Sequence, residues 1–200
     1  MGSANGRVSG ILLSDTFTEA GATLLTAHTV LPTELLGSAY LNKAGTMTCG
    51  AGTNTITQTG TTAGYAFAYI DVGVASVNAK IDALPSAARE AGLIIRNDTG
   101  AGTDGYYIVA GGATGSEALT IHLLATDAAV AGPISIGTFS AARTIVVTDD
   151  GSTITAYMED NKEGTTISVD TVLHNTNTFV GPTFIGNIIA STLSNFIVYR

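Results

Sequence analysis

The chain has 200 residues and a formal net charge of −8, with only eight lysines and arginines in total. So few cations, none of them clustered, argue against a surface for nucleic acid or for an anionic membrane, because both need several positive charges. Charged residues make up 12% of the chain and hydrophobic residues 45%, a balance that favours a surface partly covered by other protein.

The composition predicts an all-β domain. Threonine accounts for 31 residues, and β-branched side chains suit the pleated, half-buried surface of a sheet. The 24 glycines supply the turns that many short strands need. A chain of this length can form one β domain without disulfides, and its single cysteine, Cys49, excludes an intramolecular disulfide and a Cys-rich zinc site.

Residues 1–14 are rich in glycine and serine and are expected to form an arm, either flexible or anchoring the chain in an assembly. The apolar triplet at residues 11–13 is too short for the core of a signal sequence, and no run approaches the roughly 20 apolar residues that span a bilayer. The sequence therefore predicts a soluble protein made without secretion, with one domain at residues 15–200.

Alternation of apolar and polar residues dominates this domain. In residues 76–83 the odd-numbered side chains are apolar and the even-numbered ones polar. The same period of two recurs at residues 119–123, 153–158 and 167–170. A strand with one core face and one wetter face is typical of antiparallel sheets.

Turn signals separate the expected strands. Asp150-Gly151 is the strongest hairpin signal, and Asp104-Gly105 and Glu163-Gly164 predict two further turns. A single helical turn is expected at residues 84–89, where Pro85 suits a first helical position. About twelve to fourteen strands, which call for two stacked sheets, are expected within residues 15–20, 23–30, 45–49, 53–59, 65–72, 75–83, 90–97, 105–111, 118–125, 133–139, 142–149, 153–159, 165–172, 179–186 and 192–200.

Three sets of residues resemble a known family. Asp15-Thr16-Phe17 opens the domain and residues 195–200 (NFIVYR) close it; residues 91–96 (AGLIIR) precede a polar loop and residues 104–107 (DGYY); residues 149–157 form a late hairpin, followed by Val169-Asp170 and Val180-Gly181. This order is similar to that of the concanavalin A-like lectin/glucanase superfamily, in its laminin G-like and phage-encoded forms. The resemblance implies a jelly-roll β-sandwich of two curved antiparallel sheets, with the first and last strands side by side.

No catalytic residue is predicted. Glucanases of this superfamily carry a Glu-x-Asp-x-x-Glu strand, and the chain has no such run. Adjacent acids such as Asp149-Asp150 and Glu159-Asp160 would point to opposite faces of a strand, whereas glycoside hydrolysis needs two carboxyl groups on one cleft. The three histidines are scattered, and no Gly-x-Ser-x-Gly elbow occurs. We therefore expect a protein that is not an enzyme.

Two kinds of ligand site are possible. Asn97, Asp98 and Asp104 flank one loop and could offer oxygen ligands to calcium, which laminin G-like domains often bind at a rim; solvated loop acids are the alternative, and no other cofactor is expected. Tyr106, Tyr107 and Tyr157 could bind carbohydrate, since the chain has no tryptophan. The alternative is that these tyrosines pack at a sheet edge with their hydroxyls in water.

The leading functional prediction is a non-enzymatic structural protein of a bacteriophage virion, a decoration or cement module on the particle surface. Its partners would be other virion proteins, such as the major capsid protein, and further copies of itself. The alternative is a carbohydrate-binding adhesion module on a phage surface or tail, which would bind cell-surface glycans. A second alternative is a divergent glycoside-active enzyme.

Overall fold

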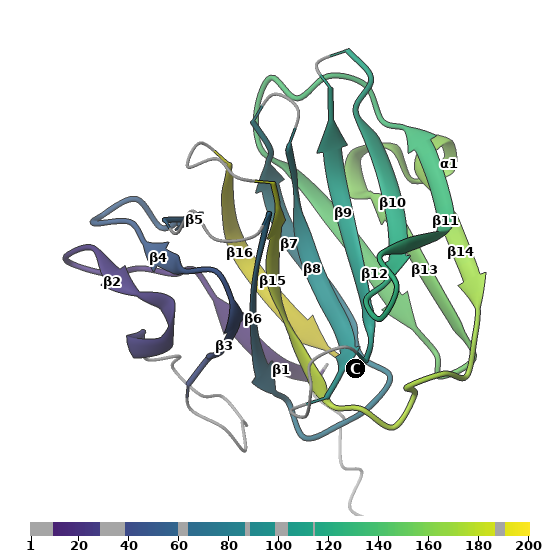
Figure 1. Ribbon diagram of the computed structural model, residues 1–200, viewed down its shortest axis with the longest axis horizontal. Helices are drawn as coiled ribbons and strands as arrows, with labels where there is room; N and C mark the ends of the chain where they lie inside the picture. The colour runs from purple at the N-terminus through teal and green to yellow at the C-terminus, as the bar shows by residue number, and fades with distance from the viewer. Residues whose placement is uncertain are drawn as a thin grey trace, which may run out of the picture.

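The computed structural model describes residues 10–28, 39–59, 64–86, 89–98, 104–113, 115–186 and 191–200. Two antiparallel sheets stack face to face in these residues (Figure 1), which confirms the predicted all-β jelly-roll sandwich. Within the same residues no helix is long and apolar enough to cross a membrane.

The nine-stranded sheet consists of β1 (Ile11–Asp15), β2 (Thr23–Leu24), β4 (Met47–Cys49), β5 (Ile56–Gln58), β7 (Asn78–Leu84), β12 (Arg143–Asp149), β13 (Thr153–Met158), β14 (Ile167–Asp170) and β16 (Thr192–Tyr199). Its order is β14-β13-β12-β7-β16-β5-β4-β2, and β1 also pairs with β16. The seven-stranded sheet consists of β3 (Leu41–Ala44), β6 (Tyr65–Asp71), β8 (Arg89–Asn97), β9 (Tyr106–Gly112), β10 (Ala118–Leu123), β11 (Ala128–Ser135) and β15 (Phe179–Ile185). Its order is β11-β10-β9-β8-β15-β6-β3.

The main core lies between the two sheets and follows the predicted alternation. On β7 the odd-numbered residues Ala79, Ile81 and Ala83 are buried, and on β13 the even-numbered residues from 154 to 158 are. The inner face of β8 contributes Leu93 to the same core. Each fully buried leucine or isoleucine contributes about 1.5–3 kcal/mol relative to exposure, so this seam holds the two sheets together.

The strands at the two ends of the described chain pair, as the resemblance implied. Across the ladder Ile11 faces Tyr199 and Asp15 faces Phe196. Strand β1 begins at Ile11 instead of residue 15, because the leucines at positions 12 and 13 are buried. An N-terminal arm would therefore have to end before Ile11, and residues 1–9 lie outside the described residues.

Helical structure in the described residues is limited to η1 (Leu25–Ala27), η2 (Glu159–Asn161) and α1 (Lys162–Thr165). The helical turn predicted at residues 84–89 is wrong at both ends, since Leu84 closes β7 and Arg89 opens β8; residues 87–88 are not described. The predicted turn at Glu163-Gly164 lies inside α1. This short helix forms because Asn161 caps its N-terminus: the side chain of Asn161 accepts a hydrogen bond from the Gly164 backbone NH at 3.3 Å.

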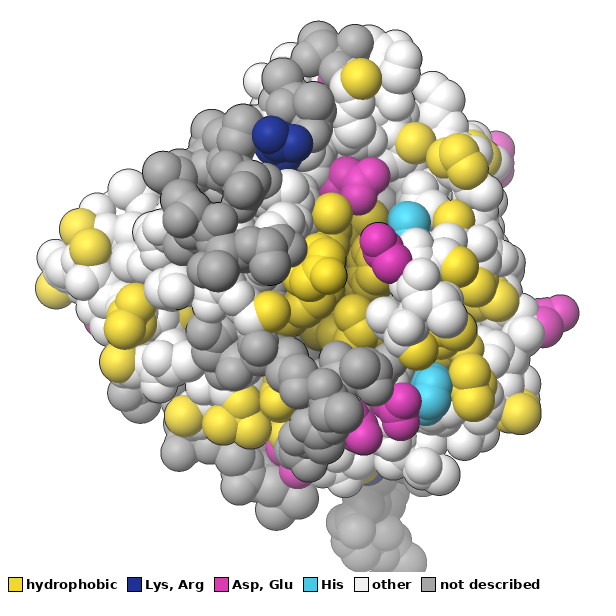
Figure 2. All heavy atoms as spheres, viewed as in Figure 1, with side chains coloured by type: hydrophobic (Ala, Val, Ile, Leu, Met, Phe, Trp, Pro, Cys, Tyr) yellow, Lys and Arg dark blue, Asp and Glu magenta, His cyan; other side chains and the backbone are white. Residues whose placement is uncertain are grey.

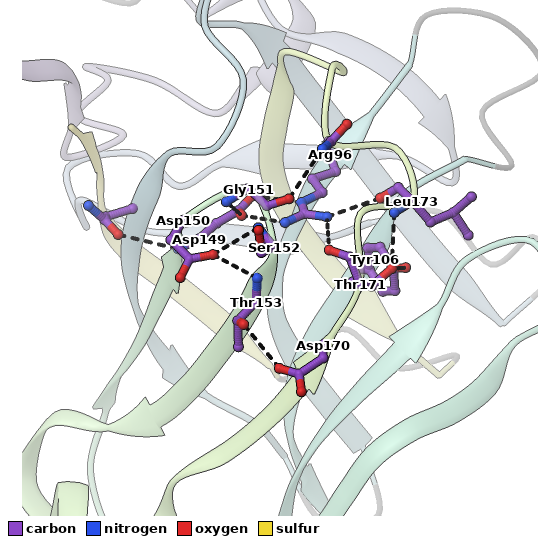
Figure 3. Close-up of polar contacts among 12 residues, drawn as sticks. Arg96, Tyr106, Asp149, Asp150, Gly151, Ser152, Thr153, Asp170, Thr171 and Leu173 are labelled. Carbon is purple, nitrogen blue, oxygen red and sulfur yellow. Dashed lines mark hydrogen bonds and ion pairs between the residues drawn. The ribbon is translucent and has the colours of Figure 1, made fainter.

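A buried ion pair joins the two sheets (Figure 3). Arg96 on β8 donates from Nε and Nη2 to the two carboxylate oxygens of Asp149 on β12, at 2.8 and 2.5 Å. Its Nη1 donates to the carbonyl oxygens of Thr171 and Leu173 at 3.0 and 3.1 Å. Both charged side chains are buried. Arg96 therefore fastens the loop after β14 to both layers of the sandwich.

A second buried polar cluster holds the N-terminal segment. His28 lies between two carboxylates, with Nε2 3.0 Å from Asp15 Oδ1 and Nδ1 2.6 Å from Glu19 Oε1, and Tyr40 donates to Asp15 Oδ2 at 3.0 Å. Burial alone lowers the pKa of His28, but the hydrogen bonds and charges of Glu19 and Asp15 outweigh it and raise this pKa above its ordinary value. Burial, with the same two acids nearby, raises the pKa of Cys49 to about 12, so this thiol stays protonated.

Candidate functional site

The three tyrosines predicted to bind sugar lie in three different environments. Tyr106 points into the core, with its hydroxyl 2.8 Å from Thr171 Oγ1, so its proposed role as an exposed platform is wrong. Tyr107 points the opposite way, onto the outer face of the seven-stranded sheet, because successive residues of a strand alternate. Tyr157 lies on the outer face of the other sheet, half-buried, with Lys162 Nζ 4.8 Å from its ring centre. The three rings therefore cannot form one site.

Four aromatic rings form a row across the outer face of the seven-stranded sheet. The rings of Tyr65 and Phe67 stack with centroids 5.4 Å apart, and Phe67 lies 6.1 Å from Tyr107. Tyr107 stacks on His122 at 4.6 Å, with only 10° between the ring planes. The row runs from β6 to β10 and is exposed mainly at its ends, since Tyr65 is 42% exposed and Tyr107 only 2%.

Two glycines lie on the strands between the two rings in the middle of this row. Strands β6 and β9 are separated by β15 and β8, which places their backbones about 14 Å apart in a flat sheet. Gly92 on β8 and Gly181 on β15 lie in this interval, opposite Thr183 and Ile94 respectively. A Cβ on Gly92 would come within 2.0 Å of the Ile108 carbonyl oxygen, so a larger residue would force the strands to move.

Figure 2 shows a hydrophobic hollow in the middle of this face, with acidic and histidine side chains at its border. Its buried floor consists of Phe67, Ile94, Tyr107 and Val109, and the partly buried residues packed against this floor are Ala44, Leu124 and Ile185. A mostly apolar depression with a few polar groups at its border is typical of small-molecule sites.

Glu90, His122 and Asp127 provide polar groups beside the floor. The hydroxyl of Tyr107 donates a hydrogen bond to the carboxylate of Asp127, and His122 Nδ1 lies 3.2 Å from the carbonyl oxygen of Asp127. Burial is the main cause of a raised pKa at Glu90; the charge of His122 lowers this pKa and that of Asp127 raises it. The border can thus offer both hydrogen-bond donors and acceptors to a polar ligand.

The carboxylate pattern of a glucanase strand does not occur on the described strands of this sheet. The outward positions of β8 are taken by Glu90, Gly92 and Ile94, so Glu90 has no second acid on its own strand face. The acid electrostatically coupled to it, Asp127, comes from the turn after β10. Two carboxyl groups therefore border the hollow, but from separate elements.

The predicted calcium ligands flank the connection between β8 and β9. Asn97 is 1% exposed, and in the described structure neither polar atom of its side chain has a hydrogen-bond partner; Asp98 Oδ1 is also buried without one. Such oxygens would suit a hard cation. Asp104, however, lies 3.5 Å from His174 Nδ1, and the described residues contain no group of three or more acidic, histidine or cysteine side chains that could hold a metal. Calcium binding at this end of β8 stays a prediction.

Tyr65, Phe67 and His122 were not singled out from the sequence as ligand-binding candidates. One local signal was available, because residues 65–69 (YAFAY) alternate aromatic residues with alanine. The alanines Ala66 and Ala68 enter the core, so the aromatic side chains must face outward. An outward aromatic face on a strand indicates a covered or ligand-binding surface.

No protein-family model matches the sequence, and no curated protein matches it either. In structure the chain is similar to the carbohydrate-binding module CBM66 from Bacillus subtilis, with a TM-score of 0.53 and 9% identity over 78% of this chain and 91% of that one. It is also similar to a family 16 glycosyl hydrolase from Mycobacterium smegmatis (TM-score 0.55, 10% identity, 95% and 100% covered) and a beta-1,3-glucanase from Mycobacterium marinum (0.50, 10%, 96% and 100%). Identities this low indicate the fold alone. The chain thus has the concanavalin A-like jelly-roll fold that its sequence resembled.

Proposed function

We propose that the outer face of the seven-stranded sheet binds carbohydrate and that the chain acts as a glycan-binding module. The observation that carries this proposal is the row of rings from Tyr65 to His122, set in an apolar hollow with polar groups at its border. The apolar faces of sugar rings pack on aromatic side chains, while hydroxyl groups bond to polar residues at the rim. The similarity in fold to a carbohydrate-binding module supports the same reading.

A glycan array on the purified protein, followed by calorimetry with the best ligand, tests this proposal. Tyr65→Ala should weaken binding by about two- to tenfold, because it removes the exposed ring of the row. Tyr157→Ala is the matched control, since that tyrosine lies on the opposite face of the sandwich. Loss of binding in Tyr157→Ala but not in Tyr65→Ala would place the sugar site on the nine-stranded sheet and would contradict the proposal.

Hydrolysis of the bound glycan is a separate outcome. The raised pKa of Glu90 in an apolar setting, with Asp127 electrostatically coupled to it, is a pattern found at catalytic acids. Release of reducing ends by the wild type, abolished in Glu90→Gln, would make the chain an enzyme. Binding without turnover supports a module that only binds.

A structural role on a phage particle is the second candidate. The observation that favours it is a pair of neighbouring aliphatic residues in the loop after β14, where Val172 is 68% exposed and Leu173 is also exposed. Such side chains suit a permanent protein contact. Co-purification with intact particles in a fixed copy number, reduced by a Val172→Ser, Leu173→Ser double substitution, is the expected result. Particles that lack the chain altogether would contradict it.

A further inference from the structure

His122 has a fixed ring at the border of the hollow. On β10 it lies directly opposite Tyr107 of β9, which explains the close stacking of the two rings. Asp127, whose backbone is in the left-handed region at φ 56°, holds both rings from the following turn. Its carboxylate accepts the hydroxyl hydrogen of Tyr107, and its carbonyl oxygen faces the imidazole of His122.

The carbonyl of Asp127 determines which nitrogen of His122 carries the proton. A carbonyl oxygen only accepts hydrogen bonds, so Nδ1, 3.2 Å away, must be the protonated nitrogen. In the neutral imidazole Nε2 is then an acceptor. Nε2 makes no hydrogen bond to any described residue, and the side chain is 18% exposed. In its neutral form His122 therefore presents an acceptor of fixed orientation beside the aromatic row.

We propose that His122 Nε2 accepts a hydrogen bond from a hydroxyl group of the bound sugar, and that His122 is the specificity-determining residue of the hollow. This inference rests on the glycan-binding function proposed above. The ligand class it implies is an uncharged sugar. Glu90 and Asp127 place carboxyl groups on the same border, and these groups disfavour the carboxylate of a uronic or sialic acid.

Two substitutions separate the two ring nitrogens. His122→Asn puts an amide near the position of Nδ1, where it can still donate to the Asp127 carbonyl, and removes Nε2. His122→Gln puts an amide oxygen near the position of Nε2 and so supplies an acceptor again. We expect His122→Asn to weaken binding of a neutral oligosaccharide by about five- to tenfold, and His122→Gln to retain most of the affinity.

The affinities of deoxy sugars distinguish a direct contact with the sugar from a merely structural role of His122. Against wild type, one monodeoxy analogue of the ligand should lose about the same five- to tenfold as the protein substitution. Against His122→Asn, that analogue should bind as well as the parent sugar, because the bond has already been removed. Thr155→Val, on the outer face of the nine-stranded sheet, is the control and should leave every affinity unchanged.

The outcomes distinguish this inference from the function on which it rests. Equal affinity of wild type and His122→Asn for the parent sugar, or tighter binding of uronic acids than of neutral sugars, overturns the role of His122 and leaves glycan binding standing. If His122→Asn does not fold, the wild-type series decides, since equal binding of all monodeoxy analogues also overturns that role. A wild-type protein that binds no glycan overturns both proposals.

Discussion

Arg96 and His28 are both buried cations that contact carboxylates, yet they respond differently to solvent conditions. Arginine side chains stay charged in proteins, and the guanidinium of Arg96 contacts Asp149 through two parallel hydrogen bonds. Burial lowers the pKa of the His28 imidazole, and its contacts with Glu19 and Asp15 raise this pKa overall, so His28 depends on these two acids to hold its proton. The link between the two sheets is therefore permanent, whereas the attachment of the N-terminal segment depends on pH.

The largest effect is expected where the permanent pair is broken. Asp149→Ala leaves the guanidinium of Arg96 buried without its carboxylate, and this should lower the free energy of unfolding by about 3–5 kcal/mol. Urea denaturation measures the change. Asp150→Ala, at the exposed neighbouring position, should have a much smaller effect. Similar losses in the two variants would mean that the hairpin, and not the ion pair, matters.

The pH dependence of stability tests the other cluster. Because the folded pKa of His28 is raised, its contribution is complete below the unfolded value of about 6.5 and is lost as the pH rises through the folded pKa. The free energy of unfolding should therefore fall as the pH rises from about 6.5 through the folded pKa of His28. His28→Gln, which cannot titrate, should be less stable at pH 6.5 and flat across this window. An unchanged slope in His28→Gln would assign the effect to another group.

A single hydrogen bond to the same cluster gives a smaller effect. Tyr40 is buried and donates to Asp15 at 3.0 Å, so Tyr40→Phe removes one bond to a charged group and little else. The free energy of unfolding should fall by about 1.5–3 kcal/mol. Burial already raises the pKa of Tyr40 well above its ordinary value, so its hydroxyl stays protonated in this comparison. If Tyr40→Phe left the free energy of unfolding unchanged, the hydrogen bond from Tyr40 to Asp15 would contribute nothing to stability.

An exposed ion pair should give the smallest effect of all. Lys80 Nζ lies 3.6 Å from Glu159 Oε1, and both side chains are partly in water. Glu159→Gln should change the free energy of unfolding by less than about 0.5 kcal/mol, and added salt should reduce even that. A loss comparable to that of Asp149→Ala would contradict the view that burial sets the strength of these pairs.

Alternation predicted most of the fold but not its irregular parts. Strands such as β7 and β13 have a clear period of two, and the structure places them within three residues of the expected bounds. Strand β11 was expected at residues 133–139 and spans Ala128–Ser135. Its first four residues are Ala128-Ala129-Val130-Ala131, which lack polar alternation because this edge strand is exposed on most sides.

The candidate site depends on strand order, which the sequence pattern does not contain. Phe67, Tyr107 and His122 come from three strands that become neighbours of one hollow only because β15 is inserted between β6 and β8. Local reasoning could assign each ring to a face of its own strand, yet it could not bring the faces together. Tyr106 and Tyr107 were predicted to bind sugar together, yet they are adjacent on one strand. Their side chains therefore point to opposite faces of the sheet.

The pairing of β1 with β16 places residues 10 and 200 in contact, and the Arg200 backbone NH donates to the Gly10 carbonyl at 3.0 Å. A polypeptide entering at one of these points and leaving at the other would cross almost no distance. The sandwich could accordingly be spliced into a loop of a host protein, or circularly permuted with a short linker, without stretching either partner. Such a graft would emerge from the nine-stranded layer, while the aromatic hollow belongs to the other layer.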